Sequence, residues 1–301
     1  MIHVIITSYG EPKATRKAIE SFLNQKNVNE EYKIIVADPF PQVEEMIVNE
    51  FPSVEYFEDP DKGKSYSLNL LFKELWNNGD IIIMSDGDVF VDEHAVSEIL
   101  SKFNDGNIGV VTGRPVSLND RNNKFGYWSH FLLDVGAHEI SRKKRYEKKK
   151  FLESTGYLFA IRNNIIKGFP TDVAEDTVIP YLFHKKGYRI GYAENARVYV
   201  KWPDNMKDWI KQKKRAADSH FKLKKHYPDF PNVKSFFNEI FEGVSFEVLK
   251  YPKNVKEIYW TFLLYPVRLY MWLSLFYDNL RKKEYKDGWR ENLAVESTRI
   301  E

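Results

Sequence analysis

Cysteine is absent from the sequence, which excludes disulfide bonds, thiol catalysis and zinc sites built from thiolates. The seven histidines show none of the short spacings that bind zinc. Neither sign of charge dominates, because the sequence has 45 lysine and arginine residues and 43 aspartate and glutamate residues. The resulting net charge of +2 gives no general case for binding nucleic acid, so any basic character must be local.

The first nine residues, MIHVIITSY, read directly as a strand and lack the basic segment and long apolar run of a secretory signal peptide. The absence of cysteine is compatible with a reducing compartment. We therefore expect a cytoplasmic protein. The 301 residues, 43% of them hydrophobic, provide enough chain for one large or two small domains.

The chain alternates between short apolar runs and segments with helical periodicity. The expected strands are residues 3–9, 33–37, 54–57, 81–84, 108–113, 151–162, 189–192 and 197–201. The expected helices are residues 13–25, 43–49, 68–75, 93–103, 174–186 (ended by Gly187) and 205–227. Strands that alternate with helices predict a parallel, right-handed doubly wound sheet over roughly the first 110 residues. The pattern is less regular between residues 115 and 150.

Two acids follow the strand expected at residues 81–84. Asp86 and Asp88 flank Gly87, so both carboxylates lie where a buried strand ends. Open α/β sheets bind ligands outside the carboxyl ends of their strands. Two crowded carboxylates repel each other, and a Mg²⁺ or Mn²⁺ ion shared with a diphosphate relieves that repulsion. The alternative is a structural turn in which Asp-Gly-Asp supplies turn and capping groups.

A basic run, RKKRYEKKK, occupies residues 142–150. Such a run is typical of a solvated face or a mobile loop. The alternative is a contact with phosphate groups or with an anionic membrane surface.

The aromatic-rich segment at residues 258–277 is about as long as a membrane span. However, Pro266 interrupts it, Arg268 lies near its middle, and its tryptophans and tyrosines are spread along it. We therefore expect helices that lie in the headgroup layer of a membrane or bind a partner, followed by the cationic residues 281–283. The alternatives are a helical hairpin packed on the core or on a partner subunit, and a true membrane span.

Several polar pieces follow one another along the chain: Thr7-Ser8-Tyr9, Asp38, Gly63-Lys64, Asp86-Gly87-Asp88, Glu175-Asp176, and a helix carrying Gln212 to Arg215. In this order and spacing, about residues 2–220 resemble the GT-A fold glycosyltransferases of family 2, the inverting family that includes cellulose, chitin and hyaluronan synthases. The most specific parts are Asp-Gly-Asp after an apolar strand and the later Glu-Asp. The resemblance implies an α/β GT-A fold, with a doubly wound, mostly parallel sheet flanked by helices and an α-helical C-terminal extension.

The resemblance also assigns residues to the nucleotide-sugar donor. The implied donor-binding residues are Thr7, Tyr9, Glu11, Asp38, Lys64, Asp86 and Arg215. Among these, Asp38 matches the acid that hydrogen-bonds the base, usually uracil. Asp88 matches the direct ligand of Mn²⁺ or Mg²⁺, and Asp86 faces the ribose or the metal. Arg215 would approach the leaving diphosphate, because a guanidinium fork matches phosphate oxygens.

On the acceptor side, Asp176 matches the catalytic base, with Glu175 beside it. The alternative for this pair is capping of the following helix, whose positive end favours acids. Gly156 and Trp202 are assigned to the acceptor, although packing is the simpler interpretation of the tryptophan.

Gln212 and Arg215 match the first and fourth positions of a Gln-x-x-Arg-Trp motif of processive synthases, and Gln212 is likewise assigned to the acceptor. Ala216 replaces the tryptophan of that motif. In the synthases this tryptophan helps hold the growing polymer, so its absence argues against processive polymerisation.

The resulting hypothesis is an inverting, metal-dependent transferase in cell-surface polysaccharide or glycoconjugate synthesis. It moves one sugar from a nucleotide-sugar, a UDP-sugar, to a hydroxyl of a glycan or lipid-linked acceptor. Residues 1–227 would form the GT-A domain, with a nucleotide-sugar-binding half (1–113) and an acceptor and catalytic-base half (114–227). Residues 228–301 would form an aromatic-rich helical extension at the inner membrane face or on a partner.

Two other functions fit parts of the pattern. A sugar nucleotidyltransferase also uses a doubly wound sheet and metal-binding acids, but it usually shows a glycine-rich loop with a basic residue directly after the first strand. Residues 7–12, TSYGEP, do not provide one. The second alternative is a non-catalytic partner that binds a nucleotide-sugar within a membrane complex.

Overall fold

The computed structural model describes residues 1–231, 233 and 246–281. The strands are β1 (Ile2–Thr7), β2 (Tyr32–Asp38), β3 (Val54–Glu58), β4 (Ile81–Asp86), β5 (Phe90–Val91), β6 (Ile108–Ser117), β7 (Leu158–Arg162) and β8 (Arg189–Val200). The helices are α1 (Pro12–Leu23), α2 (Pro41–Glu50), α3 (Lys64–Glu74), α4 (Ala95–Lys102), α5 (Lys124–Phe131), the π-helix η1 (Leu132–Lys143), α6 (Lys144–Glu147), α7 (Glu175–Lys185), α8 (Met206–His226), α10 (Phe246–Lys250) and α11 (Val255–Leu280).

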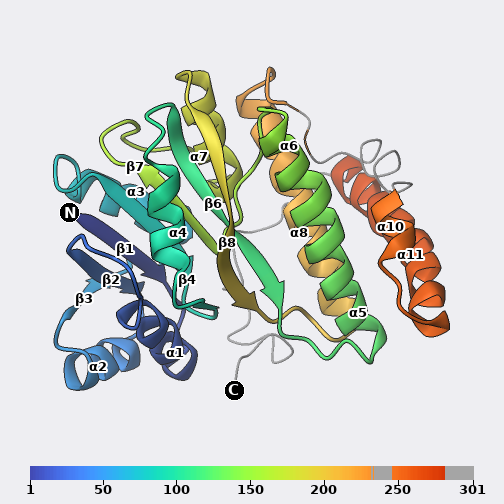
Figure 1. Cartoon of the computed structure of the whole chain (residues 1–301), viewed down its shortest axis with the longest axis horizontal. Helices are drawn as coiled ribbons and strands as arrows, with labels where there is room; N and C mark the ends of the chain where they lie inside the picture. Colours follow the sequence, from blue (N-terminus) through green and yellow to red (C-terminus); the bar gives the residue numbers. More distant parts are fainter. Residues whose placement is uncertain (232, 234–245, 282–301) are drawn as a thin grey trace.

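The strands form one sheet in the order β3-β2-β1-β4-β7-β6-β8-β5 (Figure 1). β1, β2, β3 and β4 run parallel, as the alternating pattern predicts. β7 runs antiparallel to both of its neighbours, β4 and β6. The residues that precede β7 therefore lie at the same edge of the sheet as the residues that follow β1 and β4.

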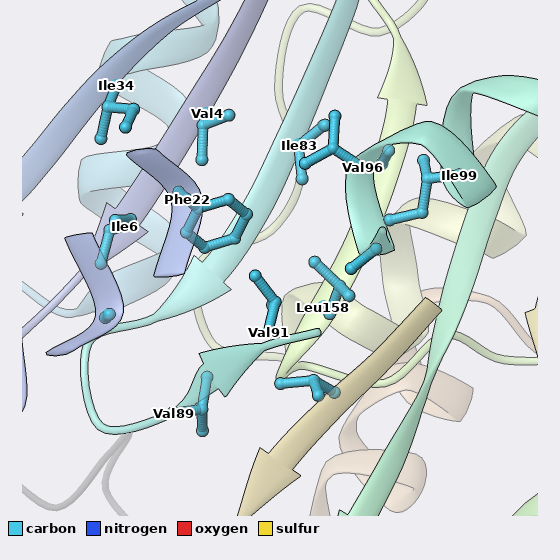
Figure 2. Close-up of a cluster of buried hydrophobic side chains, with 14 of the residues drawn as sticks. Val4, Ile6, Phe22, Ile34, Ile83, Val89, Val91, Val96, Ile99 and Leu158 are labelled. Atoms are coloured by element: carbon cyan, nitrogen blue, oxygen red, sulfur yellow. The ribbon is translucent and has the colours of Figure 1, made fainter. Parts of the chain in front are cut away.

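The core lies on both faces of this sheet because its central strands are apolar along most of their length. One face packs against α1, α2 and α4, with Val4, Phe22, Ile83 and Ile99 among the buried side chains (Figure 2). The opposite face packs against α3 and α7 through side chains such as Phe72. This double cover fixes the strand register, and with it the positions of the polar residues at the strand ends.

Two expected features of the second half are confirmed or corrected by the backbone. Gly187 has φ +89° and follows α7, and its N–H donates to the carbonyl of His184 at 2.9 Å, so the predicted C-terminal glycine is confirmed. The two strands expected at residues 189–192 and 197–201 are instead one strand, β8. A register shift between Thr112 and Arg114 of β6 accommodates the extra residues of β8 as a bulge.

The segment between residues 115 and 150, where the sequence pattern is least regular, is largely helical. Figure 1 shows α5, η1 and α6 as one continuous rod beside α8. A π-helix has a wider turn than an α-helix, so a 3.6-residue template fails to detect it. The basic run at residues 142–150 belongs partly to this rod, and Arg142 is buried, so the run is not a uniformly solvated face.

The C-terminal part that the structure describes packs on the domain through one face of α11. Tyr127, Trp128, Trp209 and Leu264 form a separate apolar cluster between α5, α8 and α11. Pro266 lies inside α11 without ending it. The helix thus packs on the core along one side, as the hairpin alternative proposed, while its opposite side stays exposed.

Two ion pairs fasten α11 to the rest of the chain. The carboxylate of Glu257 accepts hydrogen bonds from Nε and Nη2 of Arg121, both at 2.9 Å. Lys214 of α8 pairs with Asp278, and both side chains are more than four-fifths buried. Within the described residues, no helix combines the length and the hydropathy that crossing a membrane requires. Lys282 and Lys283 of the expected cationic segment lie outside the described residues.

Candidate active site at one edge of the sheet

The ends of β1 and β4 meet at the centre of the site. Thr7 is the register partner of Asp86, and its Oγ1 lies 3.4 Å from Asp86 Oδ1. The N–H of Gly87 donates to the carbonyl of Thr7 at 2.7 Å. A Cβ on Gly87 would lie 2.4 Å from the Cβ of Ser8, so only glycine fits between the two acids. The Asp-Gly-Asp sequence is therefore a close contact between strand ends as well as a pair of carboxylates.

Lys64 joins the two halves of the site. Its Nζ lies 2.5 Å from Asp86 Oδ1 and 2.5 Å from Glu175 Oε1. Gly63, with φ +104°, lets the chain turn into α3 directly before this lysine. Burial acts to lower the pKa of Lys64, but attraction to Asp86 and Glu175 outweighs it and the pKa is raised. The lysine therefore stays charged and offsets part of the local negative charge.

Asp88 lies next to this ion pair in a strongly negative environment. Burial raises its pKa to about 7, and repulsion from Asp86 and Glu11 adds to the effect. A nearby cation favours the charged form of such a carboxylate. Hard carboxylate oxygens suit Mg²⁺ or Mn²⁺, which typically bind one or two carboxylates and complete their shell with water and substrate phosphates. The described residues contain no cluster of three or more potential metal ligands, so this pair fits an ion shared with a substrate and not an enclosed protein site.

Asp38 lies one strand further along the sheet and is wholly buried. Its Oδ2 accepts hydrogen bonds from Ser8 Oγ and from the N–H of Gly10, and its Oδ1 accepts one from the N–H of Phe40 at 2.8 Å. Burial raises its pKa, and these three hydrogen bonds oppose the shift. The carboxylate thus holds the turn after β1, where Tyr9 packs edge-on against Phe40 with ring centroids 4.9 Å apart.

The second half of the site is built from α7 and from the segment before β7. Asp176 is the second residue of α7, and its Oδ2 accepts the N–H of Gly156 at 3.1 Å. Ser154 donates to the backbone carbonyl of Asp176 from its Oγ at 2.7 Å and from its N–H at 3.2 Å. A Cβ on Gly156 would lie 3.5 Å from the carboxylate of Asp176 and 3.6 Å from that of Glu175, so this glycine lies directly against both acids.

The two acids of α7 differ in their surroundings. Glu175 is 8% exposed, and burial raises its pKa although Lys64 opposes the shift. Asp176 is more accessible, and its other carboxylate oxygen accepts a hydrogen bond from Thr177 Oγ1 at 3.2 Å. Both acids benefit from the positive end of α7, as the capping alternative requires. Capping alone does not explain the contact of Glu175 with Lys64, because that lysine belongs to another helix.

Trp202 and Tyr157 close the site on the side of α8. The indole N–H of Trp202 donates to Tyr157 Oη at 3.1 Å, and Lys213 Nζ lies 3.0 Å from the centroid of the Trp202 ring. Burial raises the pKa of Tyr157, and repulsion from Asp88 and Asp86 raises it further, so the hydroxyl lies near both acids.

Attraction to the guanidinium of Arg215 lowers the pKa of Tyr157 and so opposes this shift. Arg215 therefore also lies near the site. Gln212, on the same helix, buries its Oε1 without a hydrogen-bond partner among the described residues.

The structure thus brings together the central residues assigned from the sequence: Thr7, Lys64, Asp86, Asp88, Gly156, Glu175, Asp176, Trp202 and Arg215. Asp38 and Tyr9 lie beside this group at the end of β2 and after β1. The sequence analysis missed Tyr157, Lys213 and Arg142. Tyr157 directly precedes β7, so the antiparallel direction of β7 is the signal that places it here.

A sequence model of the family described as Glycosyl transferase family 2 matches residues 3–169, more than half of the chain. The chain is 26% identical over 230 residues to the probable glycosyltransferase YdaM of Bacillus subtilis (strain 168), covering 72% of this chain and 54% of that protein. It is 23% identical over 247 residues to an N-acetylglucosaminyltransferase of Rhizobium meliloti, covering 73% and 56%. The chain therefore spans about half the length of these curated relatives.

Among solved structures, the chain resembles the mannosyltransferase PcManGT from Pyrobaculum calidifontis, whose structure holds GDP-Man and Mn²⁺. The TM-score is 0.62 at 15% identity, over 94% of this chain and 88% of that one. At this identity the likeness concerns the fold alone. It confirms the predicted class, a mostly parallel α/β sheet of the GT-A type flanked by helices.

Proposed function

Because the chain belongs to glycosyltransferase family 2, we propose that it transfers a single sugar from a nucleotide-sugar to a hydroxyl of a glycan or lipid-linked acceptor. We propose a UDP-sugar as the donor and inversion at the anomeric carbon. The observation that carries this proposal is the contact of Lys64 with both Asp86 and Glu175. It brings the acids at the end of β4 within one side-chain length of the acids of α7.

The donor is proposed to bind along the ends of β1, β2 and β4. Asp88 and Asp86 would hold a Mn²⁺ or Mg²⁺ ion, which supplies stabilisation of the negative charge that develops on the leaving diphosphate. Lys64 and Arg215 would add positive charge beside the same phosphates. Thr7, Tyr9 and Glu11, together with Asp38 and the turn that it holds, would contact the base and ribose.

The acceptor is proposed to approach from the side of Gly156 and Trp202. Asp176 takes the proton of the acceptor hydroxyl as its oxygen forms a bond to the anomeric carbon. The bond from this carbon to the diphosphate oxygen breaks, and its electron pair leaves with the nucleoside diphosphate. Attack from the face opposite the leaving group inverts the configuration. Positioned bases of this kind typically accelerate a reaction about 100- to 10,000-fold.

Transfer of one sugar is favoured over polymerisation by the helix α8. Gln212 and Arg215 keep the spacing of the motif of processive synthases, but the following position is Ala216, which is exposed. An alanine methyl group offers too little surface to stack against a sugar ring. We therefore expect one addition to each acceptor.

The proposal is tested by incubating the full chain with a panel of UDP-, GDP- and dTDP-sugars and measuring nucleotide release with Mn²⁺, with Mg²⁺ and with a chelator. We expect release of one nucleoside diphosphate that increases with an added acceptor and is lost with the chelator. Release of pyrophosphate from a nucleoside triphosphate and a sugar phosphate would instead support the nucleotidyltransferase. Binding of a nucleotide-sugar without turnover by any acceptor would support the non-catalytic partner.

We further propose that α11 attaches the protein to an anionic lipid surface, at the inner face of the cytoplasmic membrane. Its outer side carries seven apolar or aromatic residues that are each more than half exposed, at helical spacing: Val255, Tyr259, Phe262, Tyr270, Leu273, Tyr277 and Leu280. The two acids of α11 point inward, to Arg121 and Lys214. The exposed charges next to this side are Lys253, Lys256 and Arg281, all cationic, which matches anionic headgroups.

This attachment is tested by co-sedimentation with vesicles of phosphatidylglycerol and phosphatidylcholine. We expect Phe262→Glu combined with Leu273→Glu to abolish co-sedimentation, and Val48→Glu, at an exposed position of α2, to leave it unchanged. Equal partitioning of both variants would overturn the attachment. A wild-type dimer that the double variant disrupts, without vesicle binding, would assign the face to a second copy instead.

A further inference from the structure

Arg142 carries a buried guanidinium that forms no ion pair within the described residues. The side chain is 6% exposed, its Nη1 donates to the carbonyl of Ala137 at 3.4 Å, and its Nη2 donates to the carbonyl of Ser154 at 3.3 Å. Its Nε has no hydrogen-bond partner in that part of the chain. Burying a charge that is not matched by a bonded counter-charge is unfavourable, because the charge loses its hydration. Packing alone would be served better by an apolar side chain.

The helix that carries Arg142 is the 12-residue π-helix η1. Two further polar side chains of η1 at four-residue intervals also contact β6 or β8: Asp134 lies 3.4 Å from Arg114, and His138 Nδ1 lies 2.6 Å from Tyr192 Oη. Residues four apart lie on the same side of a helix, so these three side chains form one row. Segments of this type are frequent at functional sites, and this row ends at Arg142.

Ser154 connects Arg142 to the carboxylate that is proposed as the base. The residue accepts the guanidinium hydrogen bond at its carbonyl and donates its N–H and Oγ to the carbonyl of Asp176. Two residues later, Gly156 donates its N–H to Asp176 Oδ2. A single peptide segment therefore contacts the guanidinium on one side and orients the carboxylate on the other.

Electrostatic attraction acts across the same short distance. Burial lowers the pKa of Arg142, and attraction to Tyr192, Asp176 and Glu153 offsets part of this effect. Glu153 is also buried, and its Oε1 lies 2.9 Å from Nε2 of His220, a residue of α8, in a hydrogen bond. The segment before β7 is thus held at Glu153 from α8 and at Ser154 from η1.

We propose that Arg142 is a positioning residue for the transfer reaction: it fixes the segment of residues 153–156, which aims the carboxylate of Asp176 at the acceptor hydroxyl. The inference rests on the proposed function and on Asp176 as its base. It assigns no direct contact with the donor, whose proposed ligands lie at the ends of β1, β2 and β4 and on α3 and α8.

The test compares Arg142→Met and Arg142→Lys with Lys143→Met, a matched control on the next residue, whose side chain is 36% exposed. Misplacing a reacting group by about 1 Å can cost on the order of 100-fold, so we expect kcat of Arg142→Met to fall by about this factor. The KM for the donor and the affinity for UDP with Mn²⁺ should remain within about twofold, because the donor residues are untouched. Arg142→Lys should recover part of kcat, and Lys143→Met should match wild type.

A second variant keeps the inference testable where Arg142→Met fails to fold. Ser154→Ala retains the guanidinium and removes only the hydroxyl that bonds to the carbonyl of Asp176. It should also lower kcat without changing UDP affinity.

Several results would overturn the inference. Unchanged kcat in both Arg142→Met and Ser154→Ala would do so, as would parallel losses of kcat, UDP affinity and thermal stability, which indicate a purely structural role. A wild-type chain that is inactive with every donor would overturn the proposed function itself. An active wild type with an inactive Asp176→Asn and a fully active Arg142→Met would overturn only the role of Arg142.

Discussion

The two halves of the sheet bring polar groups to one edge by opposite routes. In the first half, parallel strands end at this edge, so Thr7 and Asp86 are placed by the backbone ladder between β1 and β4. In the second half, β7 begins at this edge, and the residues before it belong to no strand. Gly156 and Asp176 are placed there by hydrogen bonds from side chains and loops.

This difference has a consequence for how each half tolerates change. A backbone ladder holds its residues through many bonds, none of which depends on a particular side chain. The segment before β7 instead depends on specific partners: Thr112, Arg142, Ser154 and His220. We therefore expect substitutions distant from the substrates to lower activity mainly in the second half.

Asp176→Asn is expected to have the largest effect. Asparagine keeps the size of the side chain and still accepts the N–H of Gly156, but it takes no proton at neutral pH. We expect kcat to fall about 100- to 10,000-fold. Donor affinity, measured by calorimetry, should remain within about twofold. The control is Asp172→Asn, because Asp172 is exposed and pairs with His226. Full turnover by Asp176→Asn would remove this residue from the mechanism.

Arg121→Met tests how firmly the C-terminal helix is held. Glu257 is 6% exposed in its pair with Arg121, so removing the arginine leaves a buried carboxylate without its partner. We expect the free energy of unfolding to fall by about 3 kcal/mol in urea. Arg16→Met is the matched variant in the first half, where the side chains of Arg16 and Glu50 are 35% and 41% exposed. It should change stability little. Equal effects of the two variants would contradict this distinction between buried and exposed pairs.

His138 should make the stability of the second half sensitive to acid. Burial lowers its pKa from 6.5 to about 4, so the unfolded chain binds a proton at a higher pH than the folded one. Above pH 6.5 this residue contributes no pH dependence. Between pH 6.5 and about 4, the free energy of unfolding should fall as the pH is lowered, by roughly 3 kcal/mol in total.

The measurement is urea unfolding at several pH values, compared with His138→Gln. Glutamine retains a hydrogen bond to Tyr192 but does not titrate, so its stability curve should be flatter over this range. Identical slopes in wild type and variant would show that His138 is not the group responsible.

Lys64→Met should have the smallest effect and opposite consequences for two ligands. The lysine repels a cation at Asp86 and attracts a diphosphate, because its charge lies 2.5 Å from one carboxylate oxygen. We expect the affinity for Mn²⁺ alone to rise and the affinity for UDP to fall, each by roughly tenfold. Lys62→Met, at an exposed position two residues earlier, should change neither. Changes of the same sign for both ligands would contradict the placement of Lys64 between donor and acids.

The first half of the fold was predictable because its signals are local. Apolar runs such as residues 81–84 are long enough to identify buried strands, and their alternation with helices gives the parallel order that the structure confirms. Residues directly after those strands, such as Asp86 and Asp88, could then be placed at the ligand-binding edge. The rule that finds them needs only the position of the strand end.

The second half was less predictable because its site residues depend on tertiary contacts. Nothing in the sequence marks β7 as antiparallel, so Tyr157 could not be placed at the active edge from its position alone. Arg142 lies in a basic run that suggests a solvated surface, yet this residue of η1 is buried. Glu175 and Asp176 were found only because the resemblance singled them out, since their local pattern also fits helix capping.

Lys214 precedes Arg215 on α8 and pairs with Asp278 of α11, so α11 is linked to the helix that carries the arginine proposed to approach the diphosphate. If occupancy of the outer side of α11 shifts this helix, the shift reaches α8 and Arg215 through this ion pair and the apolar contacts between the two helices. Thermodynamic linkage then works in both directions: a surface that tightens donor binding must itself be bound more tightly when donor is present, by the same factor. Binding of the surface by α11 and binding of the donor would then be coupled within one protein.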